Sequence, residues 1–212
     1  MEFNKVIRGA KREKNDTESV NAILDAGFLC HVAFQYQGQS MIIPTAYGRD
    51  GESLYLHGST KNFMLNQILD GQTICISITH LDGIVLAKSL FNTSVNYRSA
   101  ILFGKAVLVS DEPERMNGMK TITENILKGR WDEVMVGDEH QLKATLVIKF
   151  SIDSASVKIR NEGPIGDDAI TEKVWSGQIP LVMKALQPIQ DSKFGLELEM
   201  SESVKNYFEK NR

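Results

Sequence analysis

The sequence predicts a mainly β fold, an antiparallel barrel of about six strands with small flanking helices. Two observations favour it. Tight-turn sequences separate segments rich in β-branched and aromatic residues, and only one long helix is expected, in the middle of the chain. No internal repeat and no linker rich in Pro, Gly or Ser divides the 212 residues. We therefore expect a single domain over 1–212.

The expected strands follow from turn chemistry and alternation. Turns at Gln37-Gly38 and at 49–52 join the first three strands, which we expect to pair in a row. Thr73–Thr79 alternates apolar and polar residues, as a half-buried strand does, and Gly104 is expected to bend the strand after it. The expected strands are 28–36, 39–47, 53–57, 73–79, 97–109 and 142–160.

Three helices are expected between these strands. Asp16 or Thr17 can cap the first, and Gly27 suits a left-handed stop at its end. Apolar residues at helical spacing predict a short helix over 63–68. The long helix begins at Asp111 with a proline in its first turn, and runs to about 128.

Composition narrows the class of partner. The chain has 24 Lys and Arg against 27 Asp and Glu, a net charge of −3, so nucleic acid is not an expected partner. No apolar run approaches the roughly 20 residues that cross a bilayer, and the charged segment 1–14 does not resemble a secretory signal. We expect no membrane association and a cytoplasmic protein. The two cysteines and four histidines show no metal-binding spacing.

The segment 54–62 is the first candidate site, because it runs from a strand through a turn into a helix start. Ser59 and Thr60 offer hydroxyls and Lys61 a positive charge, which together suit a phosphate. The alternative is that a hydroxyl only caps the helix while Lys61 is solvated. His57, at the strand end, is either a proton-exchanging group at the mouth of a site or a hydrogen-bonded structural histidine.

Two further segments can contact a planar ligand. In 96–100, Tyr97 can cover a ring and Arg98 can hold a phosphate or a ring edge, although both residue types are also common on strands without any ligand. Trp175, within the apolar island 174–181, suits a ring or an interface, and simple packing explains it equally well.

Taken together, these segments resemble the pyridoxamine phosphate oxidase-like superfamily of FMN-binding split barrels, in particular its nitroimidazole-resistance reductase branch. The resemblance spans 20–181 and rests on Ile43-Pro44-Thr45-Ala46-Tyr47, the turn at 50–51, Leu54-Tyr55-Leu56-His57-Gly58-Ser59, the strand 96–106, and Val174-Trp175-Ser176-Gly177. It implies a six-stranded antiparallel split β-barrel with Greek-key topology. It also implies a homodimer with FMN at the subunit interface.

The resemblance assigns roles to individual positions. It places Pro44, Thr45, Ala46 and Tyr47 along the flavin ring, and Gly58, Ser59, Lys61 and Asn62 near the ribityl chain and phosphate. It places Tyr97, Arg98 and Ser99 on a strand that contacts the cofactor, and brings Trp175 and Gly177 from the other subunit. It makes His57 face the flavin, as the catalytic proton source.

The implied function is an FMN-dependent oxidoreductase that passes electrons from a nicotinamide donor to a small planar acceptor, nitroaromatic or quinone-like. The alternatives are a flavin-binding or sensing protein without turnover, and a haem-utilisation protein on the same barrel, which would require a histidine ligand. Residues 41–46 lack the basic signature Arg-x-x-Leu-Leu-Lys of true pyridoxamine phosphate oxidases, which argues against a vitamin B6 substrate. Residues 161–212 are expected to form an extension that packs on the barrel or on the partner subunit.

Overall fold

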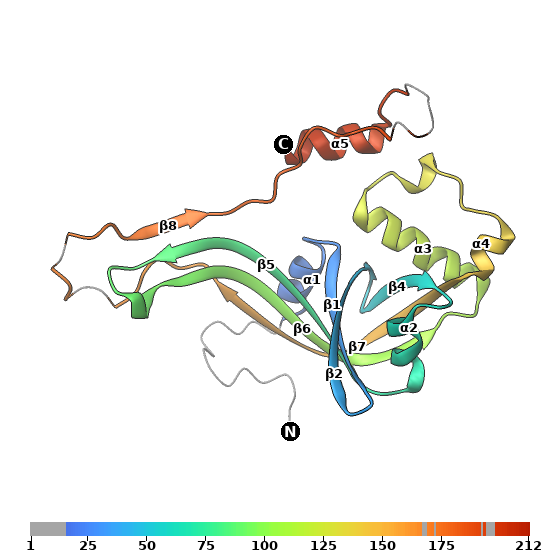
Figure 1. Ribbon diagram of the computed structural model, residues 1–212, viewed down its shortest axis with the longest axis horizontal. Coiled ribbons are helices and arrows are strands. Elements are labelled where there is room, and N and C mark those ends of the chain that lie inside the picture. Colours follow the sequence, from blue (N-terminus) through green and yellow to red (C-terminus); the bar gives the residue numbers. More distant parts are fainter. Residues whose placement is uncertain (1–15, 167–168, 172, 192, 194–197) are drawn as a thin grey trace.

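The computed structural model describes residues 16–166, 169–171, 173–191, 193 and 198–212, so the charged segment 1–14 lies outside the described residues. Eight strands of the described chain form one open antiparallel sheet, in the order β2-β1-β5-β6-β7-β4-β3 with β8 paired to β5 (Figure 1). The strands are β1 (Leu29–Tyr36), β2 (Gln39–Ala46), β3 (Gly48–Asp50), β4 (Ser53–Ser59), β5 (Ile74–Leu86), β6 (Ser94–Leu108), β7 (Thr145–Arg160) and β8 (Gly177–Pro180). The expected mainly β, split-barrel fold is confirmed.

The strand count differs from the expected six, because β3 and β8 have only three and four residues. Strands of that length show no readable alternation. The last long strand also begins later than expected. Asp138 and Gln141 form a reciprocal capping box, which makes Glu139–Lys143 a helical turn, α4, instead of the start of the strand.

The helices flank the sheet, and their starts follow the capping signals. Asp16 caps α1 (Thr17–Leu24) by accepting from the Ser19 amide at 2.8 Å, and Asp111 caps α3 (Glu112–Ile126) in the same way. Gly27 does not adopt the expected left-handed conformation. A Cβ there would lie 2.7 Å from the His80 ring, so close packing explains this glycine. The other elements are α2 (Phe63–Gln67), η2 (Ile68–Asp70), η3 (Leu90–Asn92), η4 (Trp131–Glu133) and α5 (Glu202–Asn211).

The first strands form two separate hairpins, although three strands paired in a row were expected. Gln37 and Gly38, both with positive φ, join β1 to β2, and Gly51 turns β3 into β4. These hairpins occupy opposite ends of the strand order. Between them the Tyr47 carbonyl accepts from the Asn125 side chain of α3 at 2.8 Å. Asn125, which is far along the chain, therefore holds in place the segment that connects the two hairpins.

The central strands extend beyond the barrel as a long ribbon. β5 and β6 stay paired out to Val85 and Ser94, and β8 adds to β5 from Gly83 to Leu86 (Figure 1). The expected bend at Gly104 is confirmed, since the β6–β7 register shifts between Phe103 and Gly104. The tip of the ribbon carries the short helix η3.

The main core fills the barrel with the inward residues of these strands. Ile74, Ile76 and Ile78, the apolar set of the alternating segment, are all buried there. A second cluster under α3 joins Tyr55 and Ile122 to the opposite face of the sheet. Burying side chains of this size contributes roughly 1.5–3 kcal/mol each. Of the helices that the structure describes, none has the length and apolar character needed to cross a membrane.

Candidate functional site

The corner between β4 and α2 brings together the first group of expected residues. Asn62 caps α2 by accepting from the Leu65 amide at 3.0 Å. The amides of Thr60, Lys61 and Asn62 are already bonded, to Ala144 O, Ser59 Oγ and Ser59 O. These backbone groups are thus not free to hold an anion. The exposed Lys61 amine is left as the cation of this corner, because no carboxylate among the described residues lies within 4 Å of it.

His57 lies beside this corner, at the end of β4, opposite Val147 of β7. His57 is exposed at the surface, but the atoms packed around its ring remove part of the water from it. This desolvation lowers the pKa of His57 below its ordinary value. The imidazole is therefore mainly neutral at pH 7. A neutral imidazole offers one hydrogen-bond donor and one acceptor at the mouth of the corner.

The expected flavin-ring segment of β2 is divided between two sides of the sheet. β2 lies near β4 across the open side of the barrel, so the segment is close to the corner. Pro44 is exposed, whereas Tyr47 is fully buried and donates its hydroxyl to Leu24 O at 2.6 Å. The Tyr47 side chain has no surface to offer a ligand, and it binds α1 to the sheet. Thr45 and Ala46 are half-buried between these two.

The third group lies where the ribbon leaves the barrel. Arg98 forms a two-pronged ion pair with Asp82, with N–O distances of 2.8 and 2.9 Å. This pair raises the pKa of Arg98 further and occupies two of its donors. Tyr97 and Ser99 are half-buried on the same strand. The pairing with Asp82 was not predicted, because no local pattern links the two residues.

Trp175 and Gly177 are far from the β4–α2 corner, although Gln178, next to Gly177, accepts a hydrogen bond from the Asn96 side chain, beside the third group, at 2.8 Å. Gly177 pairs with Leu86 near the tip of the ribbon, and Trp175, 64% exposed, precedes it. In Figure 1 this part of the ribbon and α2 lie at opposite ends of the long axis. One chain therefore does not bring these residues to the β4–α2 corner.

The outward face of the sheet offers a second surface that the sequence analysis missed. His31 is exposed in β1, and its neighbours across the strands are Pro44 of β2 and Ser77 of β5. Leu29 and Ile42 add exposed apolar side chains, 52% and 66% accessible. The face thus carries exposed apolar side chains around one imidazole. Only the strand register reveals it.

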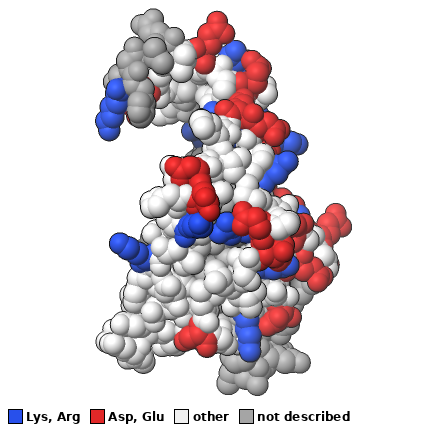
Figure 2. Space-filling model, turned by 90° about the vertical axis from the view of Figure 1, so that its right-hand side faces the viewer, with Lys and Arg blue, Asp and Glu red and all other residues white. Residues whose placement is uncertain are grey.

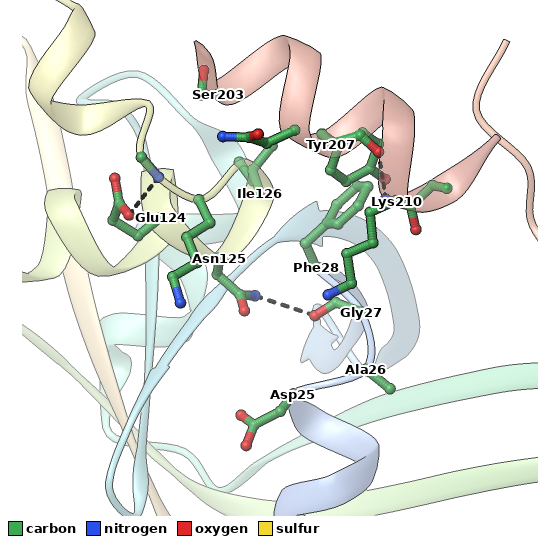
Figure 3. A pocket seen from close by; sticks show the side chains of 14 residues that line it. Asp25, Ala26, Gly27, Phe28, Glu124, Asn125, Ile126, Ser203, Tyr207 and Lys210 are labelled. Atoms are coloured by element: carbon green, nitrogen blue, oxygen red, sulfur yellow. Dashed lines mark hydrogen bonds between the residues drawn. The ribbon is translucent and has the colours of Figure 1, made fainter.

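A cavity of about 600 Å³ lies between α5, the C-terminal end of α3 and the segment before β1 (Figure 3). Figure 3 shows Tyr207 and Lys210 directed into it from α5, while Phe28 approaches from below. Lys128 and Asn206 also line it. Nothing in the sequence pattern predicted it, because α5 and α3 are far apart in the chain.

On the face of the molecule that carries α3, η4 and α4, acidic side chains outweigh basic ones among mostly uncharged residues (Figure 2). Its exposed carboxylates include Glu112, Asp132 and Glu139. Lys and Arg side chains are scattered among them without forming a continuous basic patch.

The sequence of residues 16–159 matches the model of the pyridoxamine 5′-phosphate oxidase family. This chain belongs to that family. Among curated proteins, none matches the sequence significantly. The family match ends one residue before β7 does, so it does not cover β8 or α5.

Two solved structures match almost the whole chain. The flavocytochrome Anf3 from Azotobacter vinelandii is 31% identical, with a TM-score of 0.90, over 97% of this chain and 96% of that one. The FAD and heme binding protein from Mycobacterium smegmatis is 30% identical, with a TM-score of 0.86, over 92% and 96%. Both alignments are long enough to extend beyond the family match.

The nitroimidazole-resistance branch is a more distant likeness. A putative 5-nitroimidazole antibiotic resistance protein from Bacteroides thetaiotaomicron is 19% identical, with a TM-score of 0.58, over 69% of this chain and 88% of that one. At this identity the likeness shows a shared split-barrel fold alone.

Proposed function

We propose that this chain is a homodimeric flavin-binding oxidoreductase that also holds a haem. The supporting observation is that two solved structures that match almost the whole chain, at 31% and 30% identity, are named as a flavocytochrome and as an FAD- and haem-binding protein. Both matches include most of the chain beyond residue 159, where the family model ends. We take the flavin to be FAD instead of the expected FMN, because the second relative is named for FAD.

The β4–α2 corner has side chains that suit the phosphate and the ring edge of a flavin. The Lys61 amine and the hydroxyls of Ser59 and Thr60 would hold phosphate, since nearby backbone amides are bonded elsewhere. The neutral His57 ring would donate a hydrogen bond at the flavin edge. A bound flavin supplies one- and two-electron redox chemistry, here between a nicotinamide donor and a small planar acceptor, while the protein sets position and water access.

The residues of the outward sheet face fit a haem. A haem needs a flat apolar surface and an imidazole nitrogen for the iron. His31 is exposed among Pro44, Ser77 and apolar neighbours, whereas Nε2 of His80 lies 2.9 Å from Ile23 O and is occupied there. We therefore assign the iron to His31. A bound haem supplies one-electron chemistry.

Two features of the single chain support the proposed dimer. Trp175 and Gly177 lie too far along the ribbon to join the corner of their own chain (Figure 1). Large apolar side chains of the ribbon tip and the tail are also almost fully exposed, including Phe91 at 94%, Met183 at 86% and Ile189 at 95%. Such surfaces mark an interaction site. A second copy would cover them and supply Trp175 in trans.

The absorption spectrum of the purified protein tests the cofactors. We expect two flavin bands and a Soret band, with FAD released on acid denaturation. His31→Ala should remove the Soret band and leave the flavin bands unchanged, and His57→Ala should leave both. Loss of the Soret band in His57→Ala alone would move the iron to that residue. A protein without flavin bands, even after incubation with FAD, would exclude the function.

A heterodimer experiment tests whether the site is shared between subunits. Lys61→Ala and Trp175→Ala homodimers should both bind flavin weakly. When the two variants are co-expressed with different tags and the mixed dimer is isolated, one site carries both changes and the other carries neither. About half of the sites should then regain wild-type affinity. If no site regained wild-type affinity, Lys61 and Trp175 of one subunit would contribute to the same site.

A further inference from the structure

The cavity under α5 is lined by the polar side of that helix. Ser203, Asn206, Tyr207, Lys210 and Asn211 all line it, at the i, i+3, i+4 spacing of one helix face. The apolar residues of α5, such as Phe208, do not. A helix that docks only for stability buries its apolar stripe. The contact between α5 and the barrel is therefore not an ordinary hydrophobic core.

Specific bonds fix α5 above the cavity. The Ser203 amide donates to Glu133 Oε1 at 2.8 Å, and Arg130 donates to Ser201 Oγ at 3.3 Å. At the other end of the helix, the Asn211 carbonyl accepts from the amide of Ala185, in the tail that leads to the helix, at 2.7 Å. The Ser203 and Ser201 contacts thus tie the start of α5 to η4 and the residue before it, beside the cavity.

The charges of the lining favour an anion. Both carboxylates in it are occupied, since Asp25 pairs with Arg49 and Glu124 accepts from the amides of Gly129 and Trp131 at 2.8 and 2.9 Å. The amines of Lys128 and Lys210 have no carboxylate within 4 Å among the described residues. Lys210 lies in the last turn of α5 and Lys128 two residues beyond the end of α3, and both side chains are exposed, so their amines can reach a ligand in the cavity.

The remaining walls favour a planar ring. Phe28 and Tyr207 both line the cavity, one from the segment before β1 and the other from α5 (Figure 3). Asn206 offers an amide for a ring edge, whereas the Asn125 amide is already bonded to Gly27 O and Tyr47 O. Small-molecule sites combine such aromatic walls with a few polar groups, in volumes of roughly 300–1,000 Å³. The cavity is within that range.

We infer that the cavity under α5 is a separate binding site for a mononucleotide-like anion, an aromatic ring that carries a phosphate. Lys128 and Lys210 bind the phosphate, and Phe28 and Tyr207 enclose the ring. None of these four residues belongs to the proposed flavin or haem surfaces, so the inference goes beyond the proposed function. The site is formed by α5, which the family match does not reach.

Calorimetric titration of the full-length protein, as purified with its cofactors, tests the inference with AMP as the probe. AMP should bind, and adenosine and inorganic phosphate should each bind at least about tenfold more weakly, because each lacks one half of the recognised chemistry. Lys128→Gln and Lys210→Gln should each weaken AMP binding by about tenfold. Lys205→Gln is the matched control, since Lys205 is on α5 but pairs with Glu202 away from the cavity.

Three outcomes would overturn the inference. The first is no binding of AMP at millimolar concentration, and the second is equal affinity in the wild type and both cavity variants. The third is release of flavin by AMP, followed by absorbance, which would make the cavity part of the flavin site. Absence of flavin from the protein would instead contradict the proposed function and leave the AMP measurement interpretable.

Discussion

Ser203, at the start of α5, donates two hydrogen bonds to the Glu133 carboxylate, one from its backbone amide and one from its hydroxyl. These bonds lower the pKa of Glu133 from 4.5 to about 2. They join the C-terminal helix to the segment after α3, across 70 residues of chain. The position of α5, and with it the cavity, depends on this contact.

Acid should therefore detach α5 before it unfolds the barrel. Because the pKa of Glu133 is lower in the folded state, its contribution to docking is complete above pH 4.5 and is lost as the pH falls toward about 2. NMR should show α5 amide resonances changing over that range while those of the β5 core remain. Glu133→Gln should remove this response. An unchanged response in that variant would assign the acid sensitivity to another group.

Gly104 should tolerate no side chain. A Cβ there would lie 1.9 Å from Ser151 O and 3.0 Å from the Phe150 ring, between two paired strands that cannot separate locally. We expect Gly104→Ala to lower the free energy of unfolding by about 3 kcal/mol. The matched control is Gly38→Ala, where φ is +76° and the space is open, at a cost of about 1 kcal/mol. Urea unfolding would measure both, and equal losses would contradict the packing argument.

Tyr47→Phe should affect stability and not cofactor binding. The change removes the hydroxyl that donates to Leu24 O at 2.6 Å in the buried core, at a cost of about 1–2 kcal/mol in the free energy of unfolding. Its ring packing is retained, so flavin affinity should stay the same. Weaker flavin binding with unchanged stability would instead give Tyr47 the ring-lining role that the resemblance implies.

Lys61→Ala should weaken FAD binding by about tenfold to a hundredfold, because the amine is the remaining cation of the β4–α2 corner. Riboflavin lacks the phosphate, so its affinity should hardly change. Lys120→Ala, an exposed lysine on α3, should alter neither affinity. Titration by flavin fluorescence would measure these effects. Equal losses for FAD and riboflavin would mean that Lys61 supports the fold, and no loss would direct attention to Arg98.

The sequence by itself determined the features that depend on near neighbours in the chain. The caps at Asp16 and Asp111, the turn at Gln37-Gly38 and the alternation of 73–79 are all present in the structure. Each depends on contacts within a few residues, whose side-chain and backbone preferences are the same in any fold. The family resemblance added the split-barrel fold class.

Only the tertiary structure decided which distant groups meet. The Arg98–Asp82 pair, the close packing of His80 on Gly27 and the Ser203–Glu133 contact follow from strand register and helix docking. So do the separation of the two hairpins and the distance between Trp175 and the β4–α2 corner. Such contacts are selected by the burial of the whole core, in which each pairing depends on all the others, so no short stretch of sequence specifies them.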